Sequence, residues 1–531
     1  MKESTKVKIM NRTAKTLQKI GIKQYLYNYA INRAQNKALD NLCEIKGVRK
    51  FENPNPKKII FHSLHGTYLP AIYKESAMAK ALVLRGHDVT MITCGGFIDN
   101  CSGLFHKNNP PSAKTCFNCM DFSEEFYGRV GLKHKIYMDY LKPLVEFENI
   151  KNHKEGKKYK GVDIEFHAKA SLDRYYRGAP PDEETETIKA GKIESAIYAT
   201  DLAEQIIKEE KPDTLVTSHS CYAEWGSFSD YFRNHNIPVH TWYTGYNPKS
   251  LIFNLDKIDN NFQEWLKLRK NKKLTNNEKL QLFQCRFERE KGINCDTSLY
   301  GYEKKTMSEV WDEIGLQNRN KIYGMFVNAP WDADLVETHI IFEDLYDWVS
   351  ETIDLFKEEK DKELIIKVHP AENVYQSVKS IYDYIKENKE LTENIKVLPP
   401  DTKISPYQIF DLLNVGIVYN TTAGLEMLLR GIPVISCGGC HYRGKGFTTD
   451  VKSRKSYKSA LFKEHTIGNE ELLNQYGYYY FIKSFIPFPY IYRKNFLDLG
   501  WSFMNYDKLL TDKYISHITK VIEGKKIWQD W

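Results

Sequence analysis

Three polar clusters in the C-terminal half of this chain have the composition of a site for a phosphorylated ligand. Each cluster directly follows a short apolar run, and two adjacent threonines stand where a helical pattern begins. At such a position free backbone N–H groups, the helix dipole and two hydroxyls can converge on one anion. A histidine, an arginine and a lysine add hydrogen-bond donors and positive charge. The side chains predicted to bind phosphate are His369, Asn420, Thr421, Thr422, Arg443 and Lys445.

Three neighbouring residues could extend this site. Glu426 falls on the first turns of the helical pattern and could accept hydrogen bonds from a ribose diol. Gly424 would let the start of the helix lie close to the ligand. Lys367 could add charge, although strand alternation could also turn it away. Single residues also have structural interpretations, with Thr421 as a helix N-cap and His369 as a histidine held at a strand end. Their shared position favours a ligand site.

The elements that would position these residues alternate between apolar runs and helical patterns. Apolar runs rich in β-branched residues, without polar alternation, are typical of strands buried on both faces. Regular succession of strand and helix predicts right-handed crossovers and a parallel sheet, whose ligand lies beyond the carboxyl ends of the strands. The predicted strands are residues 322–328, 364–368, 395–398, 415–419 and 432–436, and the predicted helices are residues 374–385, 406–413 and 424–429.

A second pattern of the same kind opens the N-terminal half. Residues 57–63 and 88–94 are predicted strands with a helix at 73–84 between them, and the loop after the first strand contains His65 and Gly66. The chain has no G-x-G-x-x-G motif, so a dinucleotide site has no support. The pattern predicts a second Rossmann-like domain with a glycine-containing loop at its sheet edge.

Two motifs could hold a metal ion. Four cysteines lie close together in sequence and could form a structural zinc site, but only one pair has tight ligand spacing. Free or redox-pairing thiols are therefore favoured. Asp332 and Asp334 form an Asp-x-Asp motif, which is common by chance, and we interpret it as a loop and helix start with Asp332 facing a cleft. The zinc candidates are Cys94, Cys101, Cys116 and Cys119.

Length and composition predict two domains in a cytoplasmic protein. A chain of 531 residues exceeds one compact core, and its net charge of +7 gives mild support for an anionic ligand or membrane surface. We find no apolar run of transmembrane length, no signal peptide and no nucleic-acid motif. The predicted divisions are a basic helical extension at 1–56, Rossmann-like domains at 57–245 and 321–455, a charged helical linker at 246–320 and an aromatic tail at 456–531.

Five stretches of the sequence resemble a known family. IKVHPAE, VYNTTAGLEMLLRGIPVIS and HYRGKGFTTD look like the capsule polysaccharide biosynthesis glycosyltransferases, bacterial GT-B enzymes that include Kdo transferases. A weaker resemblance covers GTYLPAIYKESAMAKALVLRGHDV and TSHSCYAEWGSFSDYF. In this family the HP and Ser/Thr-rich motifs bind the nucleotide phosphate of an activated sugar, and this chain has Thr421-Thr422 where serine is usual.

The resemblance implies an α/β protein of GT-B type, with an N-terminal acceptor domain, a C-terminal donor domain and a tail that packs back on the acceptor domain. The implied activity is metal-independent transfer of a sugar from a nucleotide-sugar to a bacterial surface glycan or a lipid-linked glycan, without a cofactor and with peripheral contact to the inner membrane left open. The alternatives are a CDP-polyol phosphotransferase, a nucleotide-sugar epimerase, and a non-catalytic glycan-binding or export-coupling protein.

Inverting transfer also needs a general base on the acceptor side. The strand predicted at 214–217 is followed by His219, whose ordinary pKa lies near neutrality, and by Glu224 on the first turn of a helix. A helix N-terminus stabilises a carboxylate and weakens it as a base, so His219 ranks first, Glu224 second and His65 third. A cap or a hydrogen bond between two loops explains each of the three equally well.

Overall fold

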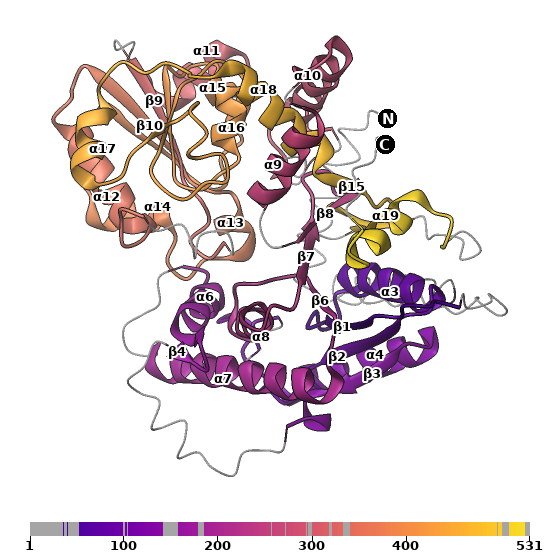
Figure 1. The fold of residues 1–531 in the computed structure, drawn as a ribbon. Helices are drawn as coiled ribbons and strands as arrows, with labels where there is room; N and C mark the ends of the chain where they lie inside the picture. The colour runs from indigo at the N-terminus through magenta and orange to yellow at the C-terminus, as the bar shows by residue number, and fades with distance from the viewer. Residues whose placement is uncertain are drawn as a thin grey trace, which may run out of the picture.

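The computed structural model describes residues 36, 40, 52–98, 101–103, 105–141, 158–178, 185–255, 258–270, 272–293, 295, 300–317, 321–332, 340–495, 498–501 and 509–525. These residues form two α/β domains, one above the other in Figure 1, with further helices and strands along one side. Most of the basic extension predicted at 1–56 lies outside the described residues.

The N-terminal domain is built on a seven-stranded sheet. Its strands are β1 (Lys58–His62), β2 (Asp88–Thr93), β3 (Lys133–Ile136), β6 (Thr214–Thr217), β7 (Val239–Thr244), β8 (Ser250–Leu255) and β15 (Phe485–Pro487). The order is β15-β8-β7-β6-β1-β2-β3, and the five strands from β7 to β3 are parallel. Strand β8 is antiparallel to β7, and β15 is antiparallel to β8. The predicted parallel sheet is confirmed, and two antiparallel strands extend it.

Helices cover both faces of this sheet, because alternate residues of a strand point to opposite sides. Ile59 and Phe61 of β1 pack in one apolar core, and Ile60 packs in another. The first core contains residues of α3 (Leu69–Leu84) and α4 (Ala113–Val130). The second contains residues of α6 (Ile164–Tyr176), α7 (Thr185–Glu210) and α8 (Ala223–Asn234). A short hairpin of β4 (Lys158–Tyr159) and β5 (Val162–Asp163) precedes α6.

The C-terminal domain is built on a six-stranded sheet in which every strand is parallel to its neighbours. Its strands are β9 (Lys321–Phe326), β10 (Lys362–Lys367), β11 (Ile395–Leu398), β12 (Val415–Val418), β13 (Val434–Ser436) and β14 (Thr449–Asp450). The order is β11-β10-β9-β12-β13-β14, with β9 central. Ile365 packs on one face and Ile366 on the other, as the unbroken apolar run predicts.

The helices of this domain include those predicted at 406–413 and 424–429, an unpredicted one at 345–357, and two in place of the one predicted at 374–385. They are α12 (Leu345–Lys357), α13 (Ala371–Tyr375), α14 (Ile381–Asn388), α15 (Pro406–Phe410) and α16 (Ala423–Leu428). The single helix predicted at 374–385 is wrong, because α13 and α14 are separate. Gln376 ends α13 with a left-handed backbone at φ +54°, and the side chain of Ser380 caps α14 by accepting the Asp383 N–H at 2.9 Å.

The segment after residue 245 joins the two domains. It contains the hairpin of α9 (Ile258–Leu268) and α10 (Asn276–Glu290), and then α11 (Met307–Ile314). Apolar residues of all three helices pack with α18 (Glu470–Tyr478) and η4 (Tyr479–Lys483) in a core of the C-terminal domain. The sequence interpretation found no sheet pattern here, and β8 corrects it.

The end of the described chain returns to the N-terminal domain, as predicted. Phe485 of β15 lies opposite Ile252 of β8, and α19 (Lys513–Ile522) shares an apolar core with α3. Between them, β16 (Ile491–Asn495) and β17 (Asp498–Trp501) form a hairpin. The earlier part of the predicted tail, α17 (Arg454–Leu461) and α18, packs instead on the C-terminal domain. None of the described helices combines the length and apolar character needed to span a bilayer.

Candidate active site

Each sheet reverses its strand order at one point, and a ligand crevice is expected there. The reversal lies between β1 and β6 in the N-terminal sheet and between β9 and β12 in the C-terminal sheet. His65 and His219 follow β1 and β6, with ring centres 6.5 Å apart. Asn328 and Asn420 follow β9 and β12, and the Asn420 N–H donates to Asn328 Oδ1 at 3.1 Å. The strand order of each sheet therefore places the two loops at its reversal point next to each other.

A cavity of about 320 Å³ lies between the two domains. Its walls come from the loops after β2 and β6, the end of α6, and the loops after β9 and β10. The carboxyl edges of both sheets thus open onto one space. The lining residues are Ser102, Gly103, Phe105, His106, Arg174, Arg177, Tyr222, Ala329, Trp331, Asp332, His369, Ala371 and Tyr375.

His369 lines this cavity as a neutral hydrogen-bond donor. Its Nδ1 accepts the backbone N–H of Ala371 at 3.1 Å, so the proton of the neutral ring is on Nε2. Burial, together with the nearby Lys367, lowers the pKa of His369 to about 4. The Lys367 amine lies over the ring of Tyr302 and has no hydrogen-bond partner among the described residues. Burial lowers the pKa of Lys367 to about 8, so positive charge at this loop comes from the lysine rather than the histidine.

Two arginines and a histidine of the N-terminal domain also line the cavity, and the sequence interpretation missed them. Arg174 Nη1 donates to the Tyr222 hydroxyl at 3.0 Å, and Arg177 Nη1 donates to the Tyr375 carbonyl at 2.6 Å, which ties α6 to the opposite domain. His106 Nδ1 is buried without a hydrogen-bond partner in the described structure. Burial and both arginines lower the pKa of His106 to about 4. The available signal was the pair of arginines three residues apart in sequence; Arg174 lies in the last turn of α6, and Arg177 ends the helix with a left-handed backbone at φ +53°.

The two threonines stand at the start of α16, where they were predicted, and already have local partners. Thr421 Oγ1 accepts the backbone N–H two residues later at 3.3 Å, and the Thr422 hydroxyl bonds to that of Tyr246. Gly424 serves packing rather than a ligand, because a Cβ there would lie 2.0 Å from the Tyr442 hydroxyl. That hydroxyl donates to the Thr421 carbonyl at 2.6 Å and fixes the loop.

Glu426 has protein partners in place of a ribose. Its Oε1 accepts from Arg289 Nε at 2.6 Å and from the Tyr407 hydroxyl at 2.8 Å. The Arg289 and Glu426 side chains are 7% and 11% exposed, so the ion pair is buried between α10 and α16. The predicted ribose contact is corrected: this carboxylate joins the linker to the C-terminal domain.

Arg443 and Lys445 also act within the protein. Arg443 Nη1 donates to the Ser436 carbonyl at 2.7 Å, and Nη2 donates to the Val451 carbonyl. The guanidinium therefore joins the ends of β13 and β14 instead of reaching a phosphate. The Lys445 amine lies 5.1 Å from the centre of the Tyr476 ring. Neither side chain lines the cavity between the domains.

On the acceptor side, His65 is held by a buried carboxylate. Glu75 of α3 is fully buried, and its Oε1 accepts from Trp242 Nε1 at 3.0 Å. His65 Nε2 lies 3.0 Å from the same oxygen, so this nitrogen faces an acceptor and carries the proton. Nδ1 then keeps its lone pair, and it has no hydrogen-bond partner within the described residues. A histidine whose ring is oriented by a carboxylate in this way can act as a general base.

His219 and Glu224 are placed less favourably for the role predicted for them. Burial, with Arg174 and His65 nearby, lowers the pKa of His219 to about 3, and its Nδ1 is 2.6 Å from the Ser218 hydroxyl. Glu224 is fully buried on α8, and its Oε1 accepts the Ser102 N–H at 2.9 Å. The geometry reverses the predicted ranking, because His65 alone combines a free ring nitrogen with a supporting carboxylate.

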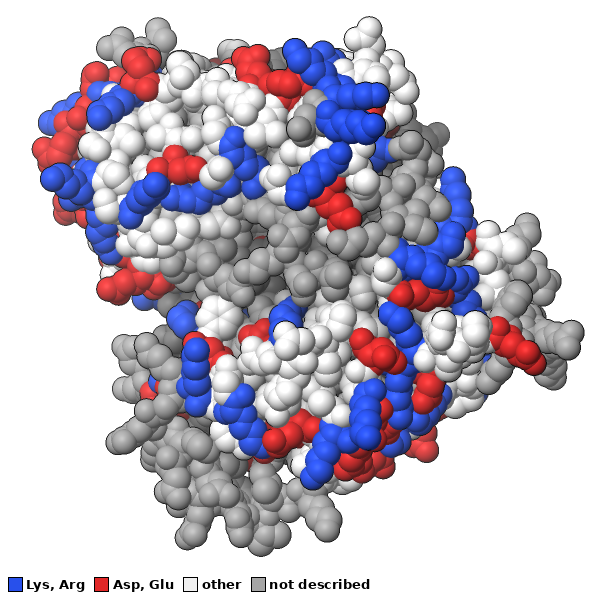
Figure 2. Space-filling view, viewed as in Figure 1, with Lys and Arg blue, Asp and Glu red and all other residues white. Residues whose placement is uncertain are grey.

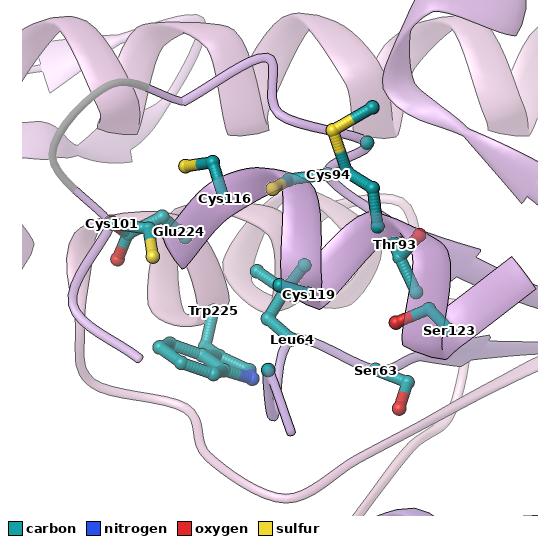
Figure 3. Close-up of a pocket in the computed structure, with 13 residues that line it drawn as sticks. Ser63, Leu64, Thr93, Cys94, Cys101, Cys116, Cys119, Ser123, Glu224 and Trp225 are labelled. Atoms are coloured by element: carbon teal, nitrogen blue, oxygen red, sulfur yellow. The ribbon is translucent and has the colours of Figure 1, made fainter. Parts of the chain in front are cut away.

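The four cysteines gather around a separate small cavity of about 30 Å³ inside the N-terminal domain (Figure 3). Glu224 and Trp225 also line it, as does Gly66. Burial raises the pKa values of Cys94 and Cys119 to about 12, so these are unreactive thiols at neutral pH. No group of three or more His, Cys, Asp or Glu side chains in the described ranges is arranged to hold a metal ion, and the zinc alternative has no geometric support.

The Asp-x-Asp motif is divided by the boundary of the described structure. Asp332 lines the cavity between the domains, as predicted, whereas Asp334 lies outside the described residues.

Two Rossmann-like domains that open onto one shared cavity define a GT-B-like fold. Residues 297–474 match the family model described as capsule polysaccharide biosynthesis protein, and this stretch contains the three C-terminal motifs that carry the predicted resemblance. No curated protein matches the chain.

Several solved structures are similar to the chain. A beta Kdo 2,4 transferase, KpsC of Thermosulfurimonas dismutans, is 15% identical with a TM-score of 0.35, covering 58% of this chain and 88% of its own. A UDP-GlcNAc 2-epimerase of Methanocaldococcus jannaschii is 12% identical with a TM-score of 0.27, covering 79% and 97%. A glycosyltransferase of Rickettsia africae is 11% identical with a TM-score of 0.27, covering 89% and 100%.

Proposed function

We propose that this chain is a glycosyltransferase that moves a sugar from a nucleotide-sugar to a bacterial surface glycan of the capsular or lipopolysaccharide type. The observation that carries the proposal is the cavity between the carboxyl edges of two Rossmann-like sheets, lined by donor groups from both domains. The family match over residues 297–474 supports the link to capsule synthesis.

The donor phosphate would bind beside the loop after β10. A neutral His369, with its proton on Nε2, can donate to an oxygen on which negative charge develops as the nucleotide leaves. The partnerless buried amine of Lys367 supports a nearby anion, because an unpaired charge in an apolar site is costly. Thr421 and Thr422 remain as hydroxyl groups at the same edge of the sheet, after β12, which is separated from β10 by β9. No metal is needed in this mechanism, and we expect none.

Arg174 in the last turn of α6 and Arg177, which ends the helix, would hold a second anionic group. Arg174 and Arg177 reach the cavity from the acceptor domain, opposite His369. Arginine guanidinium groups bind carboxylates and phosphates through two parallel hydrogen bonds. The two arginines therefore support the presence of an acidic group on the transferred sugar or on the acceptor. Arg177 also contacts the C-terminal domain through the Tyr375 carbonyl, which would couple ligand binding to closure of the domains.

His65 would be the general base that activates the acceptor hydroxyl. Nδ1 takes the hydroxyl proton as the oxygen attacks the anomeric carbon, and Glu75 stabilises the imidazolium through Nε2. We expect His65→Ala to lose transfer by roughly two to three orders of magnitude while donor binding is kept. Added imidazole should restore part of the activity, which a purely structural histidine would not allow.

The proposed setting is the cytoplasm, with a glycan or lipid-linked glycan as acceptor and no nucleic acid. The net charge of +7 supports contact with an anionic membrane surface.

The test is incubation of the purified chain with a panel of nucleotide-sugars, with and without capsular oligosaccharide acceptors, followed by measurement of released nucleotide. Acceptor-dependent release supports the transferase. Epimerised sugar without acceptor would assign an epimerase, and incorporation of polyol phosphate from a CDP-linked donor would assign a phosphotransferase. Binding of glycan with no turnover of any donor would overturn the enzymatic proposal.

A further inference from the structure

The hairpin of α9 and α10 exposes large apolar side chains. Leu280 and Phe283 are each 62% exposed, and Phe287 is 49% exposed. Their spacing of three and four residues puts all three on one face of α10. Leu268, the last residue of α9, is 59% exposed. A stripe of large exposed apolar side chains such as that on α10 marks a site of interaction.

The opposite face of α10 is already occupied. Leu282 is buried in the core of the C-terminal domain, and Arg289 is buried in its ion pair with Glu426. The helix is thus fixed to the protein through one face, and the apolar stripe on the other face is presented outward. Its exposure is a stable property of the fold.

Basic side chains surround the stripe. Figure 2 shows Lys and Arg gathered over the end of the molecule where Figure 1 shows α10. Two of the acidic residues of the hairpin are paired with arginines, Glu278 with Arg269 and Glu290 with Arg430, while Glu264 and Glu288 lie on the same hairpin as the lysines. The exposed lysines on and between the two helices are Lys267, Lys270, Lys272, Lys273 and Lys279.

We propose that the stripe Leu280–Phe283–Phe287, with Leu268 and these five lysines, docks on an anionic lipid bilayer. Exposed leucine and phenylalanine on one helix face, bordered by lysines, suit a helix that lies in the plane of the membrane interface. The apolar side chains would enter the acyl boundary, and the lysines would meet anionic headgroups. This is contact with the surface of a bilayer, and it is independent of the proposed catalytic activity.

A second copy of the chain fits this face less well. A twofold interface brings the same surface of both copies together, so the lysines would face each other. An acidic protein partner would satisfy the charge, and the test below separates it from a membrane.

The test is co-sedimentation of the full chain with vesicles of pure phosphatidylcholine and with vesicles containing about one third phosphatidylglycerol. We expect binding to the anionic vesicles that weakens with added salt. The triple variant Leu280→Gln, Phe283→Gln, Phe287→Gln should bind about tenfold more weakly or worse. Phe117→Gln is the matched control, because Phe117 is 61% exposed on α4 and should leave binding unchanged.

A second variant tests the charge. Lys272→Glu, Lys273→Glu, Lys279→Glu should also reduce binding to anionic vesicles about tenfold. Absence of binding by the wild-type chain, or equal binding by wild type and triple variant, would overturn the proposal. So would a dimer, measured by light scattering, that is lost in the triple variant while vesicle binding is unchanged. Capture of a specific acidic protein without vesicle binding would assign the face to that partner.

Discussion

Loss of the buried Glu426 carboxylate should destabilise the C-terminal domain without affecting nucleotide binding. The substitution Glu426→Gln keeps the shape of the side chain and removes its charge. Arg289 then remains buried, with its guanidinium carbon 5.0 Å from the centre of the Tyr246 ring and no carboxylate opposite. Loss of the opposite charge beside a desolvated guanidinium is what makes the change costly.

The expected magnitude follows from the burial of the pair. Both side chains are nearly removed from water, and breaking such a pair from one side costs about 3–5 kcal/mol. The double variant Arg289→Met, Glu426→Met removes both charges. The double variant should recover most of the lost stability. It should remain about 1 kcal/mol less stable than wild type, because the Tyr407 hydroxyl loses its acceptor.

The assay is urea unfolding followed by circular dichroism, with hydrogen–deuterium exchange of residues 276–290 and 423–428. The matched control is Glu125→Gln, whose partner Arg129 is exposed, and it should change stability by less than about 0.5 kcal/mol. A loss below about 1 kcal/mol in Glu426→Gln would refute the structural role. Loss of nucleotide affinity at unchanged stability would restore the ribose contact predicted from sequence.

Three further predictions concern the donor side. His369→Ala should lower turnover by roughly two to three orders of magnitude with folding intact, and a change within a few-fold would remove His369 from the leaving group. Burial raises the pKa of Glu372 from 4.5 to about 8, so folding favours the protonated carboxyl, and this contribution to stability is complete below pH 4.5 and is lost as the pH rises towards 8. Glu372→Gln should therefore raise Tm relative to wild type more at about pH 8 than at about pH 5. The opposite trend would contradict the assignment. Transfer should continue in EDTA, whereas abolition with rescue by magnesium or manganese would give Asp332 a metal.

The parallel sheets and their polar edges could be predicted from local pattern. Short, mainly apolar runs such as 364–368 are buried on both faces of a sheet, and the residue that follows such a strand lies at its carboxyl end. His369, Thr421, Thr422 and His65 were found in this way. The missed break in the helix predicted at 374–385 arose because the apolar pattern continues through Gln376, where the backbone turns left-handed.

Side-chain partners could not be predicted in the same way. Glu426 and Arg289 are 137 residues apart, and Arg443 meets backbone carbonyls whose direction depends on the ends of two strands. Arg174 and Arg177 could not be assigned from sequence, because their role depends on the cavity between the domains and, for Arg177, on its contact with the Tyr375 carbonyl of the opposite domain.

The sequence by itself determined which segments form buried strands, the order in which they alternate with helices, and the polar residues at their carboxyl ends. These properties depend on periodicity and on neighbours close along the chain. Only the tertiary structure decided which polar groups are free to act. The free groups are Lys367 and the His65 ring nitrogen opposite the one that faces Glu75, whereas the charges of Glu426 and Arg443 are used within the protein. The physical reason is that a buried charge or donor takes whichever partner the fold brings within hydrogen-bond distance, however far apart the two residues lie in sequence.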